Sequence, residues 1–473
     1  MKISRRQFLH TSACAALSAG MPFSAFAAPT GSHKLTAQKS SAQILPDKYP
    51  QTDVWSYNGT VPGPVIRVKQ GDNLDILFKN NLDVASSIHW HGVRVPNNMD
   101  GVPFITQPPV HPNEEFRYRF NTIDSGTFWF HPHLNSAEQV DRGLSGVLIV
   151  EEDQPLDIDQ ELVWMLDDWR LGEDGQIIND FQNLHDKAHG GRLGNVTAIN
   201  GTYYPSFDVR NGSRIRLRLI NNSNARLYTP RFPNLNAWVI AFDGQPVTPK
   251  KLSENILRLG PGMRADLILD IDGESAEGVD VLDTTYRGEP LPLAHFNISG
   301  KGKARTAAPA ILAPNPLSVP NLGNAEHKTI VYEGGAMGQL ASARLNGDQK
   351  TPLRNLAQQN GVVWATNGNV YTSLADLNNA KRLYQLKLGK TYIFSLQNKT
   401  SWIHPIHLHG HTYQVLARNG KKLETPMWQD TVLLYPNETV DVAFVADNPG
   451  HWMFHCHILD HAAAGMIAAL EIA

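Results

Sequence analysis

Short runs in which apolar and polar residues alternate recur along most of the chain. The clearest runs cover residues 64–69, 73–78, 213–219, 266–270 and 439–445, and Gly, Asn or Pro bounds most of them. A period of two places alternate side chains on opposite faces of a β-strand, whereas a helix would need a period near 3.6. Many short strands separated by turn residues are typical of β-sandwiches and barrels. The pattern therefore predicts an all-β protein.

A long repeat organises these strands. Residues 71–81 precede the sequence His89-Trp-His91-Gly, and residues 389–398 precede His407-Leu-His409-Gly. Later in the two copies, residues 126–133 align with residues 450–457, while a middle copy that begins at residue 212 has no histidine pair. The repeat predicts three homologous β-domains at residues 45–155, 156–305 and 326–473, with the middle one as a spacer. A proline-rich linker is expected at 306–325, and the polar stretch near 340–380 fits no predicted element.

The first 27 residues have the features of an export signal and not of a folded segment. Residues 4–9 read Ser-Arg-Arg-Gln-Phe-Leu, a twin-arginine motif, and a modest apolar stretch leads to Ala25-Phe26-Ala27, a small-x-small cleavage pattern. The apolar run is shorter than the roughly 20 residues that a membrane span requires. We therefore expect export by the twin-arginine translocase, and a periplasmic protein with no stable membrane insertion.

Charge and cysteine content narrow the function classes. The formal charge of -3 becomes about -6 without residues 1–27, and this mild acidity argues against nucleic acid as a partner, because phosphate binding needs a basic face. Cys14 lies in the leader, so the mature chain keeps Cys456 alone in an oxidising compartment. A lone exported thiol is protected best by a bound metal. We expect a monomer.

Histidines gather in four clusters at matching points of the repeat. A single His-x-His pair is more often an ordinary polar surface feature or part of a satisfied core than a ligand set, but several pairs in two repeats are a strong signal. The candidate ligands are His89, His91, His131, His133, His404, His407, His409, His455, His457 and His461. On a strand, residues two apart point to the same side, about 7 Å apart, so paired imidazoles can reach neighbouring metals.

Cys456 lies between two of these histidines. His455 and His457 should project together, and the Cys456 side chain should point to the opposite face. Two metal sites would then lie on either side of one strand and be joined by covalent bonds. Cys456, His461 and Met466 lie within eleven residues, and thiolate, imidazole and thioether together favour copper over zinc.

These motifs resemble those of the multicopper oxidases, the family of laccases and bacterial cuprous oxidases. The resemblance is carried by HWHG at residues 89–92, HPH at 131–133, HPIHLHGH at 404–411 and HCHILDHAAAGM at 455–466. It covers residues 57–473 except the polar stretch. It implies three cupredoxin-like Greek-key domains and four copper ions.

The resemblance also assigns the ligands. The type 1 copper would take His404, Cys456, His461 and axial Met466; the type 2 copper would take His89 and His407; the type 3 pair would take His91, His131 and His457 on one ion, and His133, His409 and His455 on the other. An axial Met implies a lower type 1 potential than Leu or Phe at that position.

The implied reaction has substrate electrons entering at the type 1 site, near His461 or His404. They pass through Cys456 to His455 and His457, and dioxygen is reduced to water. Asp100 lies where the family keeps an acid near the type 2 water, although an Asp-Gly pair is also a common turn. Many relatives have Glu directly after the last type 1 histidine, where this chain has Ala462. That proton route is therefore absent or supplied elsewhere, with Asp460 as the substitute candidate.

The substrate stays open between two classes. We expect a laccase-like oxidase of phenols or aromatic amines, with a metallo-oxidase of Cu(I), Mn(II) or Fe(II) that serves copper tolerance as the alternative. Only nine Met are present and they are scattered, which argues against a Met-rich copper-delivery segment. A copper-free structural relative would have lost ligands, a storage protein would not need a Cys-bridged path, and a copper nitrite reductase has two domains and lacks the paired type 3 histidines.

Overall fold

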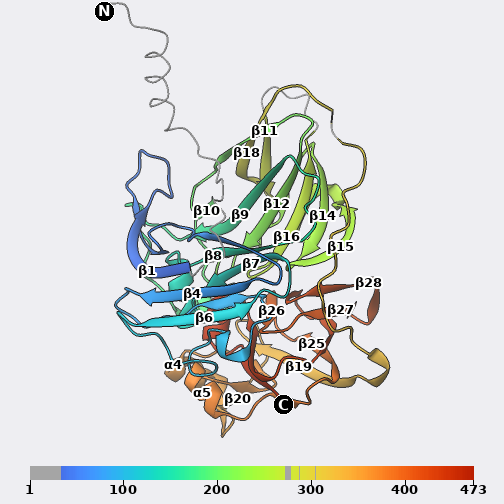
Figure 1. Cartoon of the computed structure of the whole chain (residues 1–473). Coiled ribbons are helices and arrows are strands. Elements are labelled where there is room, and N and C mark those ends of the chain that lie inside the picture. The colour runs from blue at the N-terminus through green and yellow to red at the C-terminus, as the bar shows by residue number, and fades with distance from the viewer. Residues whose placement is uncertain (1–32, 272–277, 287, 304) are drawn as a thin grey trace, which may run out of the picture.

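The computed structural model describes residues 33–271, 278–286, 288–303 and 305–473, and within them the strands form six sheets. Each of three consecutive stretches of chain contributes two sheets. Figure 1 shows the first stretch in blue to cyan, the second in green to yellow and the third in orange to red. The three parts pack against one another. The all-β prediction is confirmed. The predicted export signal lies outside the described residues, among which no helix is long and apolar enough to cross a membrane.

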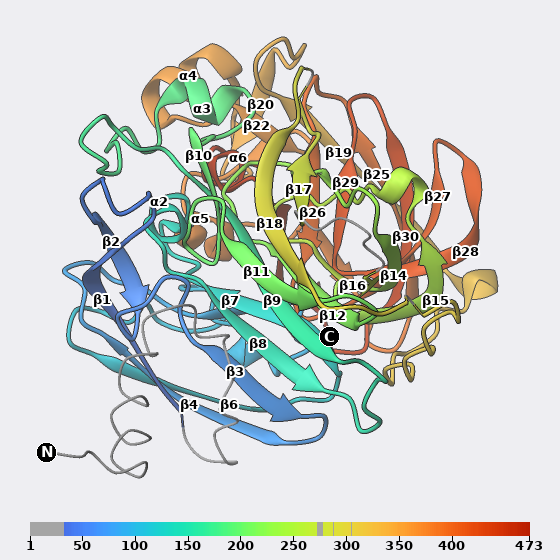
Figure 2. The same cartoon turned by 90° about the horizontal axis from the view of Figure 1, so that it is seen from above.

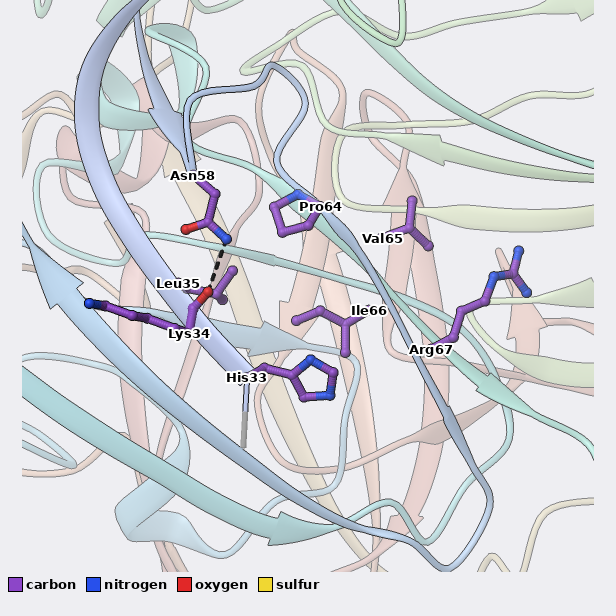
Figure 3. Close-up of a pocket in the computed structure, with 8 residues that line it drawn as sticks. All are labelled: His33, Lys34, Leu35, Asn58, Pro64, Val65, Ile66 and Arg67. Carbon is purple, nitrogen blue, oxygen red and sulfur yellow. Dashed lines mark hydrogen bonds between the residues drawn. The ribbon is translucent and has the colours of Figure 1, made fainter. Parts of the chain in front are cut away.

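The first stretch forms two four-stranded sheets, β2-β1-β4-β6 and β3-β8-β7-β5. Its elements are β1 (His33–Ala42), β2 (Thr52–Tyr57), β3 (Val65–Lys69), β4 (Asn73–Asn80), β5 (His89–His91), η1 (Asn97–Met99), β6 (Glu115–Asn121), β7 (Gly126–His131), α2 (Ser136–Asp141) and β8 (Gly146–Glu151). Strand β1 lies ahead of the predicted start at residue 45 and belongs to this unit, because it pairs with both β2 and β4. A cavity of about 200 Å³ lies between the first residues of β1 and strand β3, and Figure 3 shows the residues that line it.

The second stretch forms a six-stranded sheet, β10-β9-β12-β16-β14-β15, and a four-stranded sheet, β11-β18-β17-β13. Its elements are β9 (Gln160–Trp169), α3 (Leu184–Ala188), β10 (Val196–Ile199), β11 (Ser206–Arg210), β12 (Arg214–Asn221), β13 (Pro230–Arg231), β14 (Asn236–Phe242), β15 (Gln245–Lys251), η2 (Ser253–Asn255), β16 (Arg264–Asp270), β17 (Val279–Asp283) and β18 (Leu291–Ser299). Its apolar core lies between these two sheets.

The third stretch forms a nine-stranded sheet, β21-β20-β23-β22-β19-β25-β30-β27-β28, and a five-stranded sheet, β24-β32-β31-β26-β29. Its elements are η3 (Leu322–Asn324), β19 (Glu326–Gly334), β20 (Ser342–Leu345), β21 (Lys350–Pro352), α4 (Leu353–Asn360), β22 (Trp364–Thr366), β23 (Asn369–Val370), α5 (Leu374–Asn379), β24 (Tyr384–Leu386), β25 (Thr391–Asn398), β26 (His404–Leu408), β27 (Tyr413–Arg418), β28 (Lys421–Gln429), β29 (Thr431–Leu434), β30 (Thr439–Val445), β31 (Gly450–Cys456), α6 (Leu459–Ala463) and β32 (Ile467–Ile472).

The polar stretch near 340–380 is folded. Its short strands β20 to β23 extend the nine-stranded sheet, and helices α4 and α5 pack beside it. The backbone N–H groups of Val363 and Trp364 both donate to the carbonyl of Ala464, which fixes the stretch against the chain end that contains α6. The sequence pattern missed it because its strands are only two to four residues long, too short to show a period.

The predicted strands are present, and their burial explains their patterns. Strand β4 alternates between buried and less buried positions, as a strand with one face on the core must. Strand β7 is buried at all six positions because Phe128 and Phe130 face the core of the first unit, while Trp129 packs with Met165 and Ile220 of the second. Figure 2 shows the three units side by side. The candidate ligand histidines on β5, β7, β26 and β31 are all buried.

Candidate metal centres

Four of the five His-x-His pairs come from two pairs of adjacent strands, and the fifth is His409 with His411. In the first unit β5 lies antiparallel to β7, with His89 opposite His131. In the third unit β26 lies antiparallel to β31, with His407 opposite His455. The remaining members lie on these strands or directly after them, so the sequence repeat is also a structural repeat. We call the eight residues the histidine cluster: His89, His91, His131, His133, His407, His409, His455 and His457.

The two halves of the histidine cluster meet face to face across the boundary between the units. The ring of His89 stacks on that of His409, and the ring of His91 on that of His407, each with centroids 3.8 Å apart. All eight rings are buried, with at most 3% of any residue exposed. The structure thus brings together residues more than 300 positions apart, as the repeat predicted.

The imidazole nitrogens that face the interior of the cluster have no hydrogen-bond partner among the residues that the structure describes. These are Nε2 of His89, His131, His133 and His407, Nδ1 of His91, and both nitrogens of His457. In addition, Nε2 of His409 lies 3.1 Å from Nε2 of His455. A buried polar atom without a hydrogen bond is unfavourable by about 1–3 kcal/mol. The lone pairs of these nitrogens point into one shared space, and this arrangement is suited to binding metal ions.

Hydrogen bonds on the outer side of the rings fix which nitrogen is free. Nδ1 of His89 donates to the backbone carbonyl of Asp100 at 2.8 Å, and Nδ1 of His407 to that of Asp430 at 2.9 Å. Each therefore presents its Nε2 lone pair inward. Burial lowers the pKa of the His91, His131, His133, His409, His455 and His457 rings well below the ordinary value, and that of His407 also falls. The rings are neutral, which is the state that binds metals.

Asp100, the predicted acid, lies at the edge of the histidine cluster and is fully buried. Its Oδ2 accepts a hydrogen bond from Nδ1 of His409 at 2.9 Å, and its Oδ1 lies 3.2 Å from Nδ1 of His89. One carboxylate thus contacts a histidine from each half of the cluster. Asp100 also follows η1 and precedes Gly101, which has a positive φ, so the residue lies at a turn and makes these contacts from it.

A second buried carboxylate, Asp430, was not predicted. It follows strand β28, and its Oδ1 lies 3.2 Å from Nε2 of His91. The pair Asp430-Thr431 carries no histidine or cysteine and matches no ligand spacing, so the sequence offered no local signal for it. Only the packing of the first unit against the third reveals the contact.

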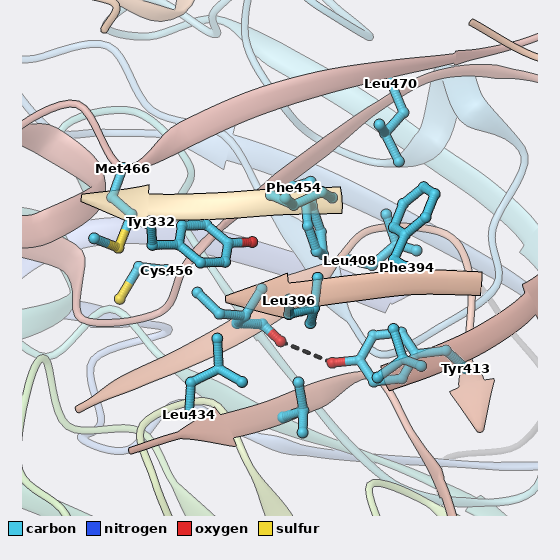
Figure 4. Close-up of a cluster of buried hydrophobic side chains, with 14 of the residues drawn as sticks. Tyr332, Phe394, Leu396, Leu408, Tyr413, Leu434, Phe454, Cys456, Met466 and Leu470 are labelled. Carbon is cyan, nitrogen blue, oxygen red and sulfur yellow. Dashed lines mark hydrogen bonds between the residues drawn. The ribbon is translucent and has the colours of Figure 1, made fainter. Parts of the chain in front are cut away.

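The second candidate centre contains the sulfur atoms, and we call His404, Cys456, His461 and Met466 the sulfur site. Sγ of Cys456 lies 3.5 Å from Nδ1 of His404 and 3.7 Å from Nδ1 of His461, and those two nitrogens are 3.1 Å apart. Figure 4 shows the sulfurs of Cys456 and Met466 at the same end of the core of the third unit. All four residues are fully buried.

The surroundings of the sulfur site prepare it for a metal. Nε2 of His404 contacts the hydroxyl of Thr400 at 2.8 Å, and Nε2 of His461 donates to the carbonyl of His189 at 2.7 Å, so both Nδ1 lone pairs face the thiol. Burial raises the pKa of the Cys456 thiol and lowers that of the His461 ring to about 3. Within the described part of the chain, no cationic side chain offsets the burial of the thiol, so its ionised form needs a bound cation.

Cys456 connects the two centres. Its thiol belongs to the sulfur site, while His455 and His457, its neighbours along the chain, belong to the histidine cluster. Nδ1 of His455 also donates to the carbonyl of Cys456 at 2.8 Å. A few covalent bonds and one hydrogen bond therefore separate the thiol from the ligand atoms of the histidine cluster.

Asp460, the substitute candidate for proton supply, lies elsewhere. Its carboxylate accepts a hydrogen bond from the backbone N–H of Arg192 at 2.8 Å, in the loop after α3. Burial raises its pKa to about 6. The Asp460 carboxylate therefore contacts the second unit. Among the described residues, no contact joins Asp460 to the histidine cluster.

Family models described as multicopper oxidase match residues 38–155, 160–277 and 348–473. A solved multicopper oxidase from Pseudomonas thermotolerans has a TM-score of 0.80 at 36% identity, over 94% of this chain and 99% of that one. A Campylobacter jejuni multicopper oxidase titled a metallo-oxidase has a TM-score of 0.74 at 27% identity, over 93% and 91%. Multicopper oxidase MmcO of Mycobacterium tuberculosis is 28% identical over 89% of this chain and 84% of its own length.

These matches cover all three units and agree with the two buried centres. The solved relatives also confirm the cupredoxin-like fold. Other matched proteins are named laccase and copper resistance protein A, so the family includes more than one substrate class. The chain belongs to the multicopper oxidase family and is a copper-dependent oxidoreductase that uses dioxygen as its electron acceptor.

Proposed function

We propose that this oxidase removes single electrons from a reducing substrate at the sulfur site and reduces dioxygen to water at the histidine cluster. The observation that carries the proposal is the position of Cys456, whose thiol lies in one centre and whose chain neighbours lie in the other. Four one-electron oxidations balance the reduction of one dioxygen, with four protons, to two waters. A direct covalent path between the centres lets the two half-reactions occur apart.

Copper would supply the one-electron redox chemistry, and we propose four ions. The type 1 ion would take the sulfur site, with His404, Cys456 and His461 as the strong ligands. Their ligand atoms lie within 4.8 Å of one another, as do those of His133, His409 and His455, which we assign to one type 3 ion. His91, His131 and His457 would hold the other type 3 ion, and His89 and His407 the type 2 ion.

Asp100 is the proposed proton-handling residue. It accepts from His409 and lies beside His89, so it borders the proposed type 2 and type 3 positions together. A buried carboxylate in hydrogen-bond reach of the reacting region can deliver protons as water forms.

The substrate would be a phenol or aromatic amine, because the outer surface of the sulfur site is aromatic. Both His404 and His461 are fully buried, so the expected entry edge is covered. The cover is the segment that includes His189, whose ring stacks on His185 at 4.2 Å and lies 5.4 Å from Trp402. His185 has 78% of its side chain exposed. Stacked rings suit a planar substrate, and the His189 carbonyl is hydrogen-bonded to His461.

A metallo-oxidase is the second candidate. Met337 is 74% exposed, and the N–H of the preceding Ala336 donates to Ala188, so a thioether lies near the same segment. A thioether with imidazoles favours Cu(I). A solved relative is titled a metallo-oxidase. This function would place the enzyme in metal oxidation or copper tolerance.

We further propose a periplasmic monomer exported by the twin-arginine route. The motif at residues 4–9 and the cleavage pattern at 25–27 support export. Replacing both Arg5 and Arg6 by Lys should retain the precursor in the cytoplasm, which cell fractionation would measure.

Oxygen uptake tests the function and separates the two substrates. Copper-loaded protein is assayed with 2,6-dimethoxyphenol, Cu(I) and Mn(II), alongside the variants Trp402→Ala and Met337→Leu. For the aromatic function, Trp402→Ala raises KM for the phenol and Met337→Leu does not. The metallo-oxidase would be favoured if Met337→Leu raised the KM for Cu(I) and if neither the original protein nor the variants oxidised the phenol. Absence of oxygen uptake with every reductant would contradict both.

A further inference from the structure

Three charged residues form a fully buried group beside the histidine cluster, and we call Asp430, Arg264 and Asp243 the Asp430 clamp. Nη1 of Arg264 donates to Oδ1 of Asp430 at 2.8 Å, and Nη2 donates to Oδ2 at 2.6 Å. Asp243 accepts from the backbone N–H of Arg264 at 2.9 Å. None of the three is more than 1% exposed at its side chain. Burying an arginine and two acids away from water is unfavourable in free energy. We therefore expect these three residues to have a function that explains their burial.

Asp430 contacts two candidate ligands that come from different units. Its Oδ1 lies 3.2 Å from Nε2 of His91, and its backbone carbonyl accepts from Nδ1 of His407 at 2.9 Å. The opposite nitrogens, Nδ1 of His91 and Nε2 of His407, are the ones without protein partners. A partner on the outer nitrogen fixes the tautomer and the direction of the ring. Asp430 therefore directs one lone pair from each unit into the cluster.

The oxygens of Asp430 could in principle bind a metal themselves, since their distances to His91 and His407 also suit a three-ligand group. Arg264 argues against that use. Its guanidinium makes a two-point contact with both carboxylate oxygens, which places a fixed positive charge where a cation would have to sit. Although burial raises the pKa of the Asp430 carboxyl, the attraction of Arg264 outweighs it and lowers the pKa below the ordinary range. Asp430 is thus an anchored acceptor.

The anchor comes from the second unit. Arg264 is the first residue of β16, and Asp243 follows β14 in the same sheet. Oδ2 of Asp243 also accepts from the backbone N–H groups of Asp430, at 3.3 Å, and Thr431, at 3.2 Å. The second unit therefore holds both the side chain and the backbone of the turn between β28 and β29. Within the described residues, no candidate ligand group includes a member of this unit.

We infer that the second unit, expected only to space the other two, positions copper ligands of the histidine cluster through Arg264 and Asp430. The inference rests on the proposed function, because it assumes that His91 and His407 bind copper. The type 2 ion should depend on it most, since it has two protein histidines and one of them is His407. The type 3 ion next to His91 has two further histidines to hold it.

Arg264→Met tests the inference, with Arg214→Met as the matched control. Arg214 is a buried arginine of the same sheet that makes the same two-point contact, at 2.6 and 2.9 Å, with Asp270, away from the histidine cluster. Each purified variant is loaded with copper. Copper per chain, the electron paramagnetic resonance signal of type 2 copper and the blue type 1 absorption are then measured.

Arg264→Met should keep the blue absorption and bind type 2 copper roughly 10–100-fold more weakly, the usual effect of removing a residue that orients a ligand. Arg264→Lys should restore binding only in part, because lysine keeps the charge without the two-point contact. Arg214→Met should lower stability and leave the ratio of type 2 signal to blue absorption unchanged.

An unchanged ratio in Arg264→Met would overturn the inference while leaving the oxidase function intact. An equal fall of both signals in Arg264→Met and Arg214→Met would also overturn it, because general destabilisation would then explain the loss. If the unsubstituted protein showed neither signal, the proposed function would fail first and the inference with it.

Discussion

At the scale of single residues, the chemistry depends on atoms held without a protein partner. The free nitrogens of the histidine cluster and the buried Cys456 thiol are unfavourable in an empty protein and become favourable once metal is bound. Asp100 touches both halves of the cluster through its side chain. The variant Asp100→Asn should separate its proton-handling function from metal binding, because the amide oxygen can still accept the hydrogen bond from Nδ1 of His409.

Asp100→Asn should slow the oxygen step by roughly 100-fold or more, since an amide cannot deliver a proton. The rate at which an anaerobic reductant bleaches the type 1 absorption should stay the same, because the sulfur site is unchanged. Stopped-flow absorption measures bleaching and reoxidation separately. Asp124→Asn is the control, because it removes a buried carboxylate of the same unit that pairs with Arg94. Equal reoxidation rates in Asp100→Asn and the original protein would contradict the role.

At the scale of elements, the turn before β16 brings the second unit against the histidine cluster. Gly262 lies in this turn with φ of +82°, and a Cβ at this position would lie 2.7 Å from Cγ of His457. The turn can approach so closely only because it has no side chain there. His457 has no hydrogen bond at either nitrogen, so contact with this turn is one of the restraints on its ring.

Gly262→Ala should displace His457 and weaken the type 3 pair. The effect would be seen as reduced copper per chain and slower oxygen uptake. Gly389→Ala is the matched control, because Gly389 has φ of +77° with nothing within 4 Å of the added atom. Both variants share a backbone cost of about 1–2 kcal/mol for a left-handed conformation. A similar loss of copper in the two variants would show that backbone strain, and not contact with His457, is responsible.

The sequence predicted the site residues that lie in the internal repeat and missed those that lie outside it. Strands β5, β7, β26 and β31 were predictable because histidines mark matching points of the two copies. Asp430 and Arg264 were not, because each is one charged residue among many until the units pack. His189 contributes a backbone carbonyl, which any residue could supply. Trp364, in the stretch that fitted no pattern, lies with its ring centroid 4.5 Å from that of His461.

At the scale of the whole molecule, three units share one buried region, and its neutral histidines make folding sensitive to acid. Burial lowers the pKa of His461 to about 3 and that of His411 to about 4. It also lowers the pKa of seven rings of the histidine cluster, those of His91, His131, His133, His407, His409, His455 and His457. In the unfolded chain these groups titrate near 6.5. Above that pH neither state is protonated. Below it the unfolded chain takes up protons that the folded protein excludes, so the free energy of unfolding falls.

Copper-free protein should therefore lose stability as the pH falls from about 6.5, with each buried ring contributing up to about 1.4 kcal/mol per pH unit until its own folded pKa is reached. Urea unfolding at pH 7.5 and pH 5.5 measures the change. Saturating copper should raise the free energy of unfolding at pH 7.5, by about 4 kcal/mol when free copper is a thousand times its dissociation constant. Equal unfolding midpoints at the two pH values would contradict the argument from burial.

The central claim is that Cys456 joins a substrate-oxidising centre to an oxygen-reducing one, and Cys456→Ser tests it most directly. The visible spectrum and oxygen uptake of the copper-loaded variant are compared with those of the original protein. We predict loss of the blue absorption and of oxygen uptake, while the type 2 copper signal remains because the histidine cluster is intact. A variant that kept both its colour and its oxygen consumption would contradict the account.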